Sequence, residues 1–181
     1  MNSMGKNVIK KIKGMGVVIL LSTLLGACWQ AQAQTVVDGD FTVSLTVKCD
    51  TLLDNMHMLD RDKHELVPPD GIIFPTTIVA VYEGDTVFDL LQREMRNAGI
   101  HMSSRFTPAF NSAYVEAINN LYEFDGGPLS GWMYKVNDWF PNFGSCQYIL
   151  QPDDVIVWVY TLDLGRDVGE NWMHGDWLNN D

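Results

Sequence analysis

The sequence predicts an α+β fold in which a mixed β-sheet packs against one main helix. Apolar and polar residues alternate at 41–49 and 132–136, a pattern typical of half-buried strands. A continuous apolar run at 155–161, VIVWVYT, indicates a further and strongly buried strand. Between these strands, residues 87–99 place apolar side chains at helical spacing, which predicts a single amphipathic helix.

Residues 1–27 are predicted to be a lipoprotein leader that precedes the folded domain. Four lysines precede the apolar run GVVILLSTLL, which is too short to span a membrane comfortably. The run ends in LGAC, which resembles the bacterial lipoprotein box, so Cys28 is the expected lipidation site. Plain secretion with cleavage after Ala33 is the alternative. Both interpretations place the protein outside the cytoplasm, and in the lipoprotein interpretation the lipid anchor is the only expected contact with the membrane.

The charge beyond the leader is strongly negative. Eight basic residues stand against 23 acidic ones, which gives a net charge of −15. Nucleic acids and anionic lipid surfaces require a basic partner surface. The composition therefore argues against both classes of partner.

The first half of the domain is expected to contain two strands separated by a long irregular segment. Residues 28–40 are interpreted as a tether, and the strand at 41–49 follows. Residues 50–70 are mixed in composition and end before Gly71 in Pro-Pro-Asp, which predicts an extended loop. A second strand is expected at 78–82.

The main helix is expected to follow the turn after the second strand. Asp85 or Thr86 can cap its first turn, and Gly99 is a typical stop signal. Residues 100–124 are ambiguous, because 113–121 fits either a strand or a turn of helix. Four residues of this stretch are expected to be buried: Ile118, Leu121, Tyr122 and Phe124.

The second half of the domain is expected to contain a hairpin and two further strands. The strand at 132–136 meets a tight turn at Asn137-Asp138, and a return strand is expected to begin at Trp139-Phe140. A short strand is predicted at 147–150 and the strongest one at 155–161. Residues 170–181 are interpreted as a tail.

The cysteine content beyond Cys28 consists of Cys49 and Cys146. An even pair in an exported chain predicts a disulfide bond. The bond would close a loop of about 97 residues, for which the chain-entropy relation gives about 4–5 kcal/mol. Two buried free thiols are the alternative interpretation.

Several quoted stretches resemble one family. They are VSLTVKCDTLLDN (43–55), YEGDTVFDLLQ (82–92), LYEFDGGPLSGWMYKVNDWFPNFG (121–144) and LQPDDVIVWVYTLDLGRDVG (150–169). They resemble the transcobalamin-like C-terminal domain family of bacterial exported domains, which is similar to the small domain of vertebrate cobalamin carriers. The resemblance covers about residues 41–169. It implies a β-grasp fold, and it makes cobalamin or a related corrinoid the first ligand to test.

The aromatic cluster of 126–142 is the candidate binding surface. Apolar residues beside a turn are hard to explain by packing, and exposed aromatic patches often mark binding sites. A corrin is broad and mostly apolar with amide arms, so flat aromatic rings with backbone and amide donors suit it. Core packing is the alternative for the aromatic residues of 132–136. The candidate ligand-binding residues are Ser130, Gly131, Trp132, Tyr134, Asn137, Trp139 and Phe140.

The sequence therefore predicts an exported ligand-binding module without catalytic activity, resident cofactor or metal. It contains no G-x-S-x-G, H-E-x-x-H or P-loop motif, and its four histidines are scattered. The alternative is a cell-surface interaction or adhesion module that meets a surface or transporter protein and binds no small molecule.

Overall fold

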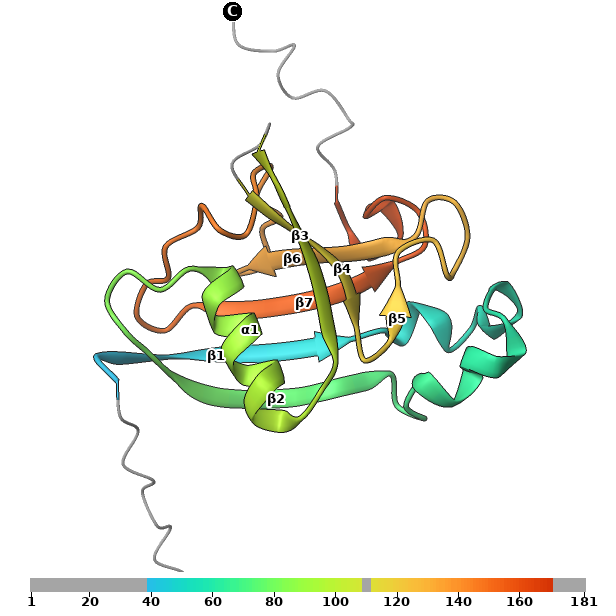
Figure 1. The fold of residues 1–181 in the computed structure, drawn as a ribbon, viewed down its shortest axis with the longest axis horizontal. Helices are drawn as coiled ribbons and strands as arrows, with labels where there is room; N and C mark the ends of the chain where they lie inside the picture. Colours follow the sequence, from blue (N-terminus) through green and yellow to red (C-terminus); the bar gives the residue numbers. More distant parts are fainter. Residues whose placement is uncertain (1–38, 109–111, 171–181) are drawn as a thin grey trace, which may run out of the picture. The chain divides into compact units, whose positions relative to one another are not determined.

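The four-stranded sheet is built around two apolar central strands. In the computed structural model its order is β2-β1-β7-β6, with β1 parallel to β7 and the outer pairs antiparallel. Figure 1 shows the four strands, which are β1 (Phe41–Lys48), β2 (Ile72–Val81), β6 (Gly131–Val136) and β7 (Val155–Thr161). β7 is apolar up to its last residue, Thr161, and residues on both of its faces are buried. The predicted mixed sheet is confirmed.

The structure describes residues 39–108 and 112–170, which belong to one unit of the chain, Val36–Asp181. The predicted leader, the lipidation site Cys28 and nearly all of the tether and tail lie outside the described residues. Within the described ranges, no helix is long and apolar enough to cross a membrane.

Helix α1 (Val87–Ala98) is capped at its N-terminus by Thr86, which is one of the two predicted capping residues. The Thr86 Oγ1 accepts a hydrogen bond from the Asp89 N–H at 3.2 Å, and the Asp89 carboxylate accepts one from the Thr86 N–H at 3.0 Å. Asp85 instead forms an ion pair with Arg93 at 2.5 Å. Gly99 ends the helix at a φ of 70°, a conformation that glycine adopts readily.

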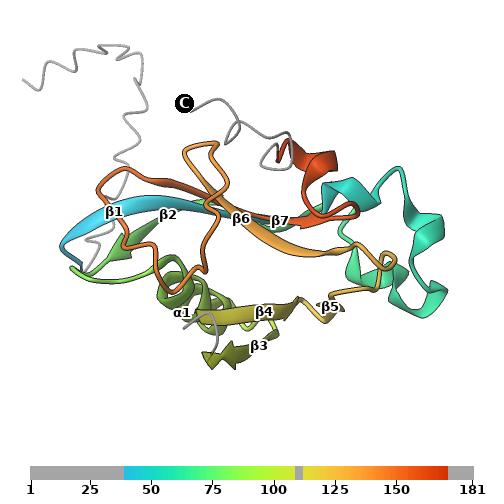
Figure 2. The same cartoon turned by 90° about the horizontal axis from the view of Figure 1, so that it is seen from above.

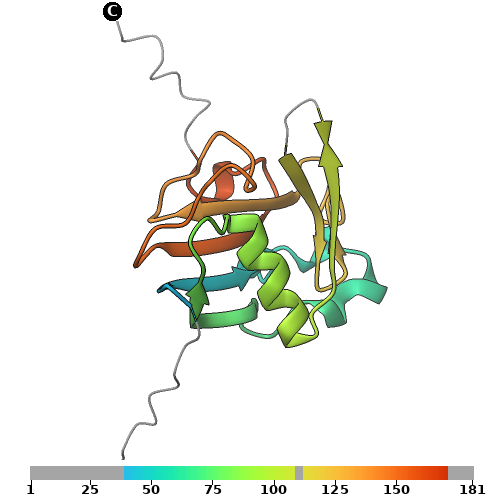
Figure 3. The same ribbon diagram turned by 60° about the vertical axis from the view of Figure 1, so that its left-hand side comes forward.

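The buried face of α1 covers one face of the four-stranded sheet, as Figure 3 shows. Val87, Leu90, Leu91 and Met95 provide this face. They pack with the alternating buried residues of β1, which are Val43, Leu45 and Val47. The apolar face of the helix and the apolar face of the strand therefore share one core.

Residues 102–122 form a second sheet, which resolves the ambiguous stretch in favour of strands. Its antiparallel order is β3 (Met102–Thr107), β4 (Ser112–Ile118) and β5 (Leu121–Tyr122). Figure 2 shows this sheet on the same side of the large sheet as α1, with the 3-10 helix η5 (Arg166–Val168) on the other side. Ile118 and Leu121 are buried as predicted.

Two burial predictions in this region are wrong. Tyr122 and Phe124 are both exposed, although they follow buried residues closely. β5 ends at Tyr122, and Phe124 has a φ of 68°, so the chain turns there and their rings leave the core side. Apolar character alone did not reveal this turn.

The long excursion at 50–70 is folded onto the domain. It contains three 3-10 helices, η1 (Asp50–Leu52), η2 (Met56–Met58) and η3 (Arg61–Leu66). Thr51 Oγ1 donates to the Tyr160 carbonyl at 2.6 Å, and Lys63 pairs with Asp125 at 2.5 Å. These long-range contacts hold the excursion against β7 and the 122–127 turn.

Strand β2 begins earlier than the predicted 78–82. It includes Pro75, which cannot donate a ladder hydrogen bond. β2 is an edge strand, and its register with β1 shifts between Leu45 and Val47, opposite Thr77 and Phe74. The bulge accommodates the proline, and an edge position tolerates it.

The predicted return strand at Trp139-Phe140 does not form. Residues 137–138 make the expected tight turn, with φ values of 51° and 64°, but only an isolated bridge joins Val136 to Trp139. β6 pairs with β7 instead, and Pro141 lacks the N–H that a longer ladder would need. The predicted strand at 147–150 is likewise reduced to one bridge between Thr86 and Ile149.

The predicted disulfide between Cys49 and Cys146 is absent, and both are free cysteines. Cys49 follows β1 in the large sheet, where its N–H donates to the Gly71 carbonyl at 2.7 Å. Cys146 lies against the second sheet, where its Sγ accepts from the Ala113 N–H at 3.3 Å. The two thiols are thus held by different layers of the fold.

Candidate functional site

An open cavity of about 790 Å³ lies between the second sheet and the segment 141–147, beside the edge strand β6. Volumes of 300–1,000 Å³ are typical of small-molecule sites. The described residues that line it come from β3, β4, β6, the turn after β5 and the 141–147 segment. They are Arg105, Thr107, Ser112, Ala113, Tyr114, Glu123, Met133, Pro141, Asn142, Phe143, Gly144 and Gln147.

The lining contains apolar and aromatic side chains from three elements. Tyr114 of β4 and Phe143 of the 141–147 segment are each about two-fifths exposed, and Met133 of β6 also belongs to the lining. Phe143 also belongs to an aromatic row. Its ring is 6.0 Å from that of Trp139 in an edge-to-face arrangement, and 6.4 Å from Tyr148 in a stacked one.

The polar groups of the cavity carry both signs of charge. Arg105 pairs with Glu116 at 3.1 Å, yet its side chain remains 63% exposed. Burial raises the pKa of Tyr114, and its hydrogen bond with Glu123 raises it further. The phenol is therefore neutral at physiological pH, and the cavity offers a hydroxyl, a carboxylate and a guanidinium to a ligand.

The 143–147 segment is held in place by bonds to three neighbouring elements. The Tyr134 hydroxyl donates to the Phe143 carbonyl at 2.9 Å, and burial raises the pKa of that hydroxyl. The Phe88 N–H donates to the Ser145 carbonyl at 3.2 Å. Together with the Cys146 contact to β4, these bonds fix the position of the segment that lines the cavity.

Gly144 allows the segment to approach β4 closely. A Cβ at this position would lie 1.7 Å from the Ser112 Oγ and 2.3 Å from its Cβ. No side chain fits in that space. Glycine at position 144 is thus required for the 141–147 segment to lie this close to β4.

Four of the predicted ligand-binding residues belong to the interior. Ser130 is buried, where its Oγ lies 2.9 Å from the Tyr160 hydroxyl. The Trp132 indole is buried and donates to the Leu121 carbonyl at 2.9 Å. Gly131 and Tyr134 are also buried, and Tyr134 supports the cavity wall without lining it. The core interpretation of the 132–136 aromatics is confirmed.

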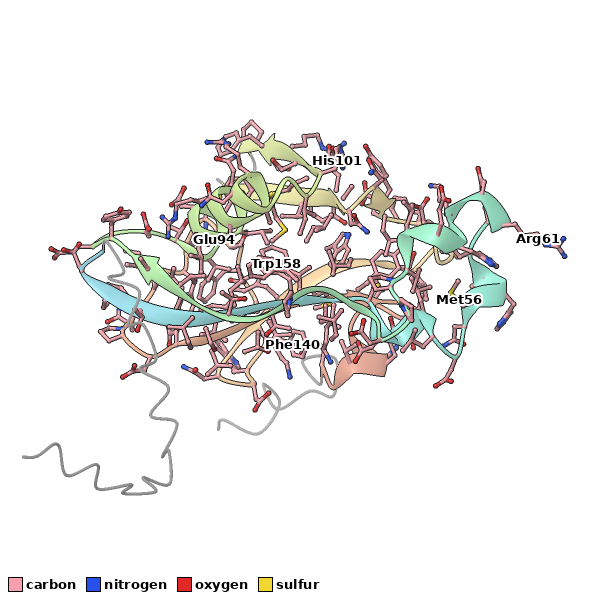
Figure 4. The ribbon with its side chains drawn as sticks, turned by 90° about the horizontal axis from the view of Figure 1, so that it is seen from below. Met56, Arg61, Glu94, His101, Phe140 and Trp158 are labelled. Atoms are coloured by element: carbon pink, nitrogen blue, oxygen red, sulfur yellow. The ribbon has the colours of Figure 1, made fainter. Side chains whose placement is uncertain are left out.

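The three predicted residues around the turn, Asn137, Trp139 and Phe140, have different environments. Trp139 is 53% exposed, whereas Phe140 is only 8% exposed, so the expectation that both rings face outward is wrong for Phe140. Figure 4 shows Phe140 on the opposite side of the large sheet from Trp158, which lies toward α1. Asn137 bonds to Asp154 and Val155, so its side chain stabilises the turn.

Most of the predicted binding residues thus do not line the cavity. Trp139 lies near it, because its ring packs against that of Phe143 in the lining. Asn142 belongs to the aromatic cluster of 126–142, and Phe143 follows it directly in the sequence. Arg105 and Tyr114 come from the stretch whose secondary structure was ambiguous. If that stretch is assigned to strands, alternation predicts that both residues lie on the surface. It does not predict that they line a cavity together with Phe143.

Metal ligands do not gather in the described part of the chain. Across residues 39–108 and 112–170, no group of three or more His, Cys, Asp or Glu side chains could hold a metal ion.

Comparison with known proteins gives a family match and two weak structural likenesses. Residues 84–161, less than half of the chain, match a family described as a domain of unknown function, DUF4430. No curated protein matches significantly. Haptocorrin in complex with Cbi is similar over 68% of this chain and 25% of that chain, at 11% identity and a TM-score of 0.48. The chain therefore spans about a quarter of that structure.

The second structure is a candidate metal-binding protein from Ruminococcus gnavus. It is similar over 67% of this chain and 97% of that chain, at 7% identity and a TM-score of 0.40. The ligands named for the two solved structures belong to those proteins.

Proposed function

We propose that the protein is an exported, non-catalytic binding module whose 790 Å³ cavity takes an amphipathic small molecule, with cobalamin or a related corrinoid as the lead candidate. The observation that carries this proposal is the cavity itself. It is open to solvent, and its lining combines aromatic and apolar side chains with a few polar groups, as ligand sites commonly do. The sequence resemblance to transcobalamin-like domains supports the choice of corrinoid.

The lining suits the two chemical parts of a corrinoid. Tyr114, Met133 and Phe143 offer flat or polarizable apolar contact to the broad ring. Arg105, Glu123 and Asn142 offer donors and acceptors to amide arms. An open cavity contacts one face or edge of such a ligand, so the rest remains available to solvent or to a partner.

The proposal is tested by titrating the purified chain with hydroxocobalamin and following visible absorbance and tryptophan fluorescence. We expect saturable binding that Phe143→Ala weakens about tenfold, because an aromatic contact contributes about 0.5–1.5 kcal/mol beyond its buried area and about 1.4 kcal/mol is a factor of ten. Phe124→Ala is the matched control, because Phe124 is exposed and outside the cavity lining. Absence of saturable binding, or equal loss in both variants, contradicts the corrinoid proposal.

A protein-interaction function has one specific observation in its favour. Phe106, Trp139 and Ile149 are each more than half exposed, and exposed apolar groups often mark protein contacts. If Trp139→Ala abolishes capture of a surface or transporter protein while hydroxocobalamin has no effect on any signal, this second function replaces the first.

We also propose that Cys28 anchors the chain to the outer side of the cell membrane. The basic, short apolar leader and the LGAC sequence support this proposal. Cys28→Ala is expected to move the protein from the membrane fraction to the soluble exported fraction. Unchanged fractionation would favour plain secretion.

A further inference from the structure

Strand β3 has a strand neighbour on one side only in the described part of the chain. It stands at the end of the order β3-β4-β5, and Figure 2 shows it farther from the large sheet than β4. Ser104, Arg105 and Phe106 are exposed, Phe106 to 59%. The outer N–H and C=O groups of an edge strand can pair with a further strand, so β3 is a candidate site for strand addition.

The edge strand β2 is protected against such pairing, whereas β3 is not. β2 contains Pro75 and a register shift, and proteins commonly use both features to block an edge. β3 contains no proline, and its register shift lies at the Ser103 end, so residues 104–107 pair regularly with β4. Arg105 is the charged residue of β3, and its ion pair with Glu116 at 3.1 Å draws it toward β4 and away from the open edge.

We propose that β3 binds an extended peptide segment of a partner protein as an added strand, in which basic and apolar side chains alternate. Strand addition derives its affinity from main-chain hydrogen bonds and its specificity from alternate side chains, which point to opposite faces. Arg105 and Thr107 line the cavity, whereas Ser104 and Phe106 do not. The added strand therefore places every second side chain on the cavity side. The proposal does not depend on the corrinoid, because it requires only the strand edge and the adjoining rim of the cavity.

The cavity side of β3 suits a basic side chain. The Arg105 guanidinium is paired with Glu116, which also accepts a hydrogen bond from the Ser103 Oγ at 3.0 Å. Glu123 in the lining adds a second carboxylate, whose hydrogen bond is with the neutral phenol of Tyr114. Two carboxylates therefore stand against one guanidinium, and the chain beyond the leader has 15 excess negative charges. This charge attracts a cationic segment and opposes a second copy of the same acidic chain.

The opposite side of β3 suits an apolar side chain. Neighbouring strands lie about 4.8 Å apart, and cross-strand pairs of aromatic and β-branched side chains stabilise a sheet. The exposed ring of Phe106 has such a partner if the added strand carries valine or isoleucine on this side. An extended segment that alternates lysine or arginine with a β-branched residue thus matches both sides of β3.

The experiment uses the exported chain in mild detergent and the heptapeptide TVKVKVT-amide, which carries rhodamine at its N-terminus and is followed by fluorescence anisotropy. We expect saturable binding, and about tenfold weaker binding of TVEVEVT, in which glutamate replaces both lysines. TVKPKVT should not bind, because its central proline lacks a main-chain donor. Glu123→Gln should reduce the preference for the lysine peptide over the glutamate peptide.

Two further measurements identify the strand that the peptide joins. Phe106→Ala should weaken binding of TVKVKVT several-fold, whereas Ile78→Ala should not, because Ile78 is equally exposed but belongs to the edge strand β2. Amide hydrogen exchange, followed by NMR, should slow within residues 104–107 when the peptide is added. Exchange along β2 should remain unchanged.

The proposal is overturned if TVKVKVT does not bind saturably, if the proline peptide binds equally well, or if exchange at 104–107 ignores the peptide. A concentration-dependent dimer that slows exchange at 104–107 without peptide would overturn it in favour of a second copy. Hydroxocobalamin is titrated separately. Peptide binding without a cobalamin response supports strand addition and contradicts the corrinoid, and a cobalamin response without peptide binding does the reverse.

Discussion

The side-chain amide of Asn137 joins the β6 turn to the start of β7 through the buried carboxylate of Asp154. Its Nδ2 donates to the Asp154 Oδ1 at 2.8 Å, and its Oδ1 accepts the Val155 N–H at 2.9 Å. Asp154 also accepts the Gln151 N–H at 2.9 Å. A residue that the sequence offered as a ligand contact therefore has its polar atoms engaged in the fold.

Asn137→Ala is expected to lower the free energy of unfolding by about 1–3 kcal/mol, because it removes the side-chain donor to the buried Asp154 carboxylate. The positive φ of 51° adds to the loss, since alanine resists that conformation more than asparagine does. Equilibrium urea denaturation measures the change. Asp138→Asn is the control, because that side chain is 91% exposed and its ion pair with Lys135 is a surface pair of small effect, so it should change stability far less. Equal losses would contradict the role of Asn137.

The neighbouring rings Trp139 and Phe140 are expected to differ sharply in their contribution to stability. Phe140→Ala should cost about 3–5 kcal/mol, as for other buried phenylalanines. Trp139→Ala removes a half-exposed ring and its contact with Phe143, for which about 0.5–1.5 kcal/mol is typical. Both values come from urea denaturation in the same buffer. A larger loss for Trp139 than for Phe140 would show that the packing is assigned wrongly.

The free thiol of Cys49 predicts a loss of stability at alkaline pH. Burial, with the carboxylates Asp50 and Asp70, raises the pKa of Cys49 from 9.0 to about 12. Below pH 9 the thiol is protonated in both states, so its contribution is fully present. Above pH 9 the unfolded thiol ionises while the folded one does not, so stability falls as pH rises toward 12.

In reducing buffer, the stability difference between the wild type and Cys49→Ala should shrink by about 1.4 kcal/mol between pH 8 and pH 10. Cys146 and the tyrosines are present in both proteins, so their titration cancels in the comparison. Urea denaturation at several pH values provides the measurement. A difference that stays constant with pH would show that Cys49 is not protected in the folded state.

The close approach of Gly144 to Ser112 predicts a specific rescue. Gly144→Ala should weaken hydroxocobalamin binding and lower the unfolding temperature, because its Cβ would overlap the Ser112 Oγ and Cβ. Adding Ser112→Gly removes both atoms and should restore binding toward the wild-type value. Ser112→Ala retains the Cβ and should not. Rescue by both substitutions would place the clash at the hydroxyl alone.

The capping box of α1 predicts a moderate and chemically specific effect. Thr86→Ala should lower the free energy of unfolding by about 1 kcal/mol, since the Asp89 N–H loses its acceptor. Thr86→Ser keeps the hydroxyl and should retain most of the stability. Thermal or urea denaturation distinguishes the two variants, and equal losses would show that the methyl group matters more than the cap.

The sequence by itself determined the elements whose evidence is local. The alternation of 41–49 identified the buried face of β1, the Thr86 and Gly99 signals bounded α1, and the run at 155–161 matched β7. Each depends on periodicity or on a cap formed within a few residues. The core role of Trp132 and Tyr134 was likewise one of the two interpretations that alternation allowed.

Only the tertiary structure decided which side chains form the cavity. Period-2 alternation says that residues share a face, but it does not say which distant segment covers that face. Tyr114 and Phe143 line one cavity because β4 and the 141–147 segment pack beside β6, through bonds such as Tyr134 to Phe143. Phe140 is buried and Trp139 exposed for the same physical reason: long-range contacts, absent from any local pattern, determine where each ring lies.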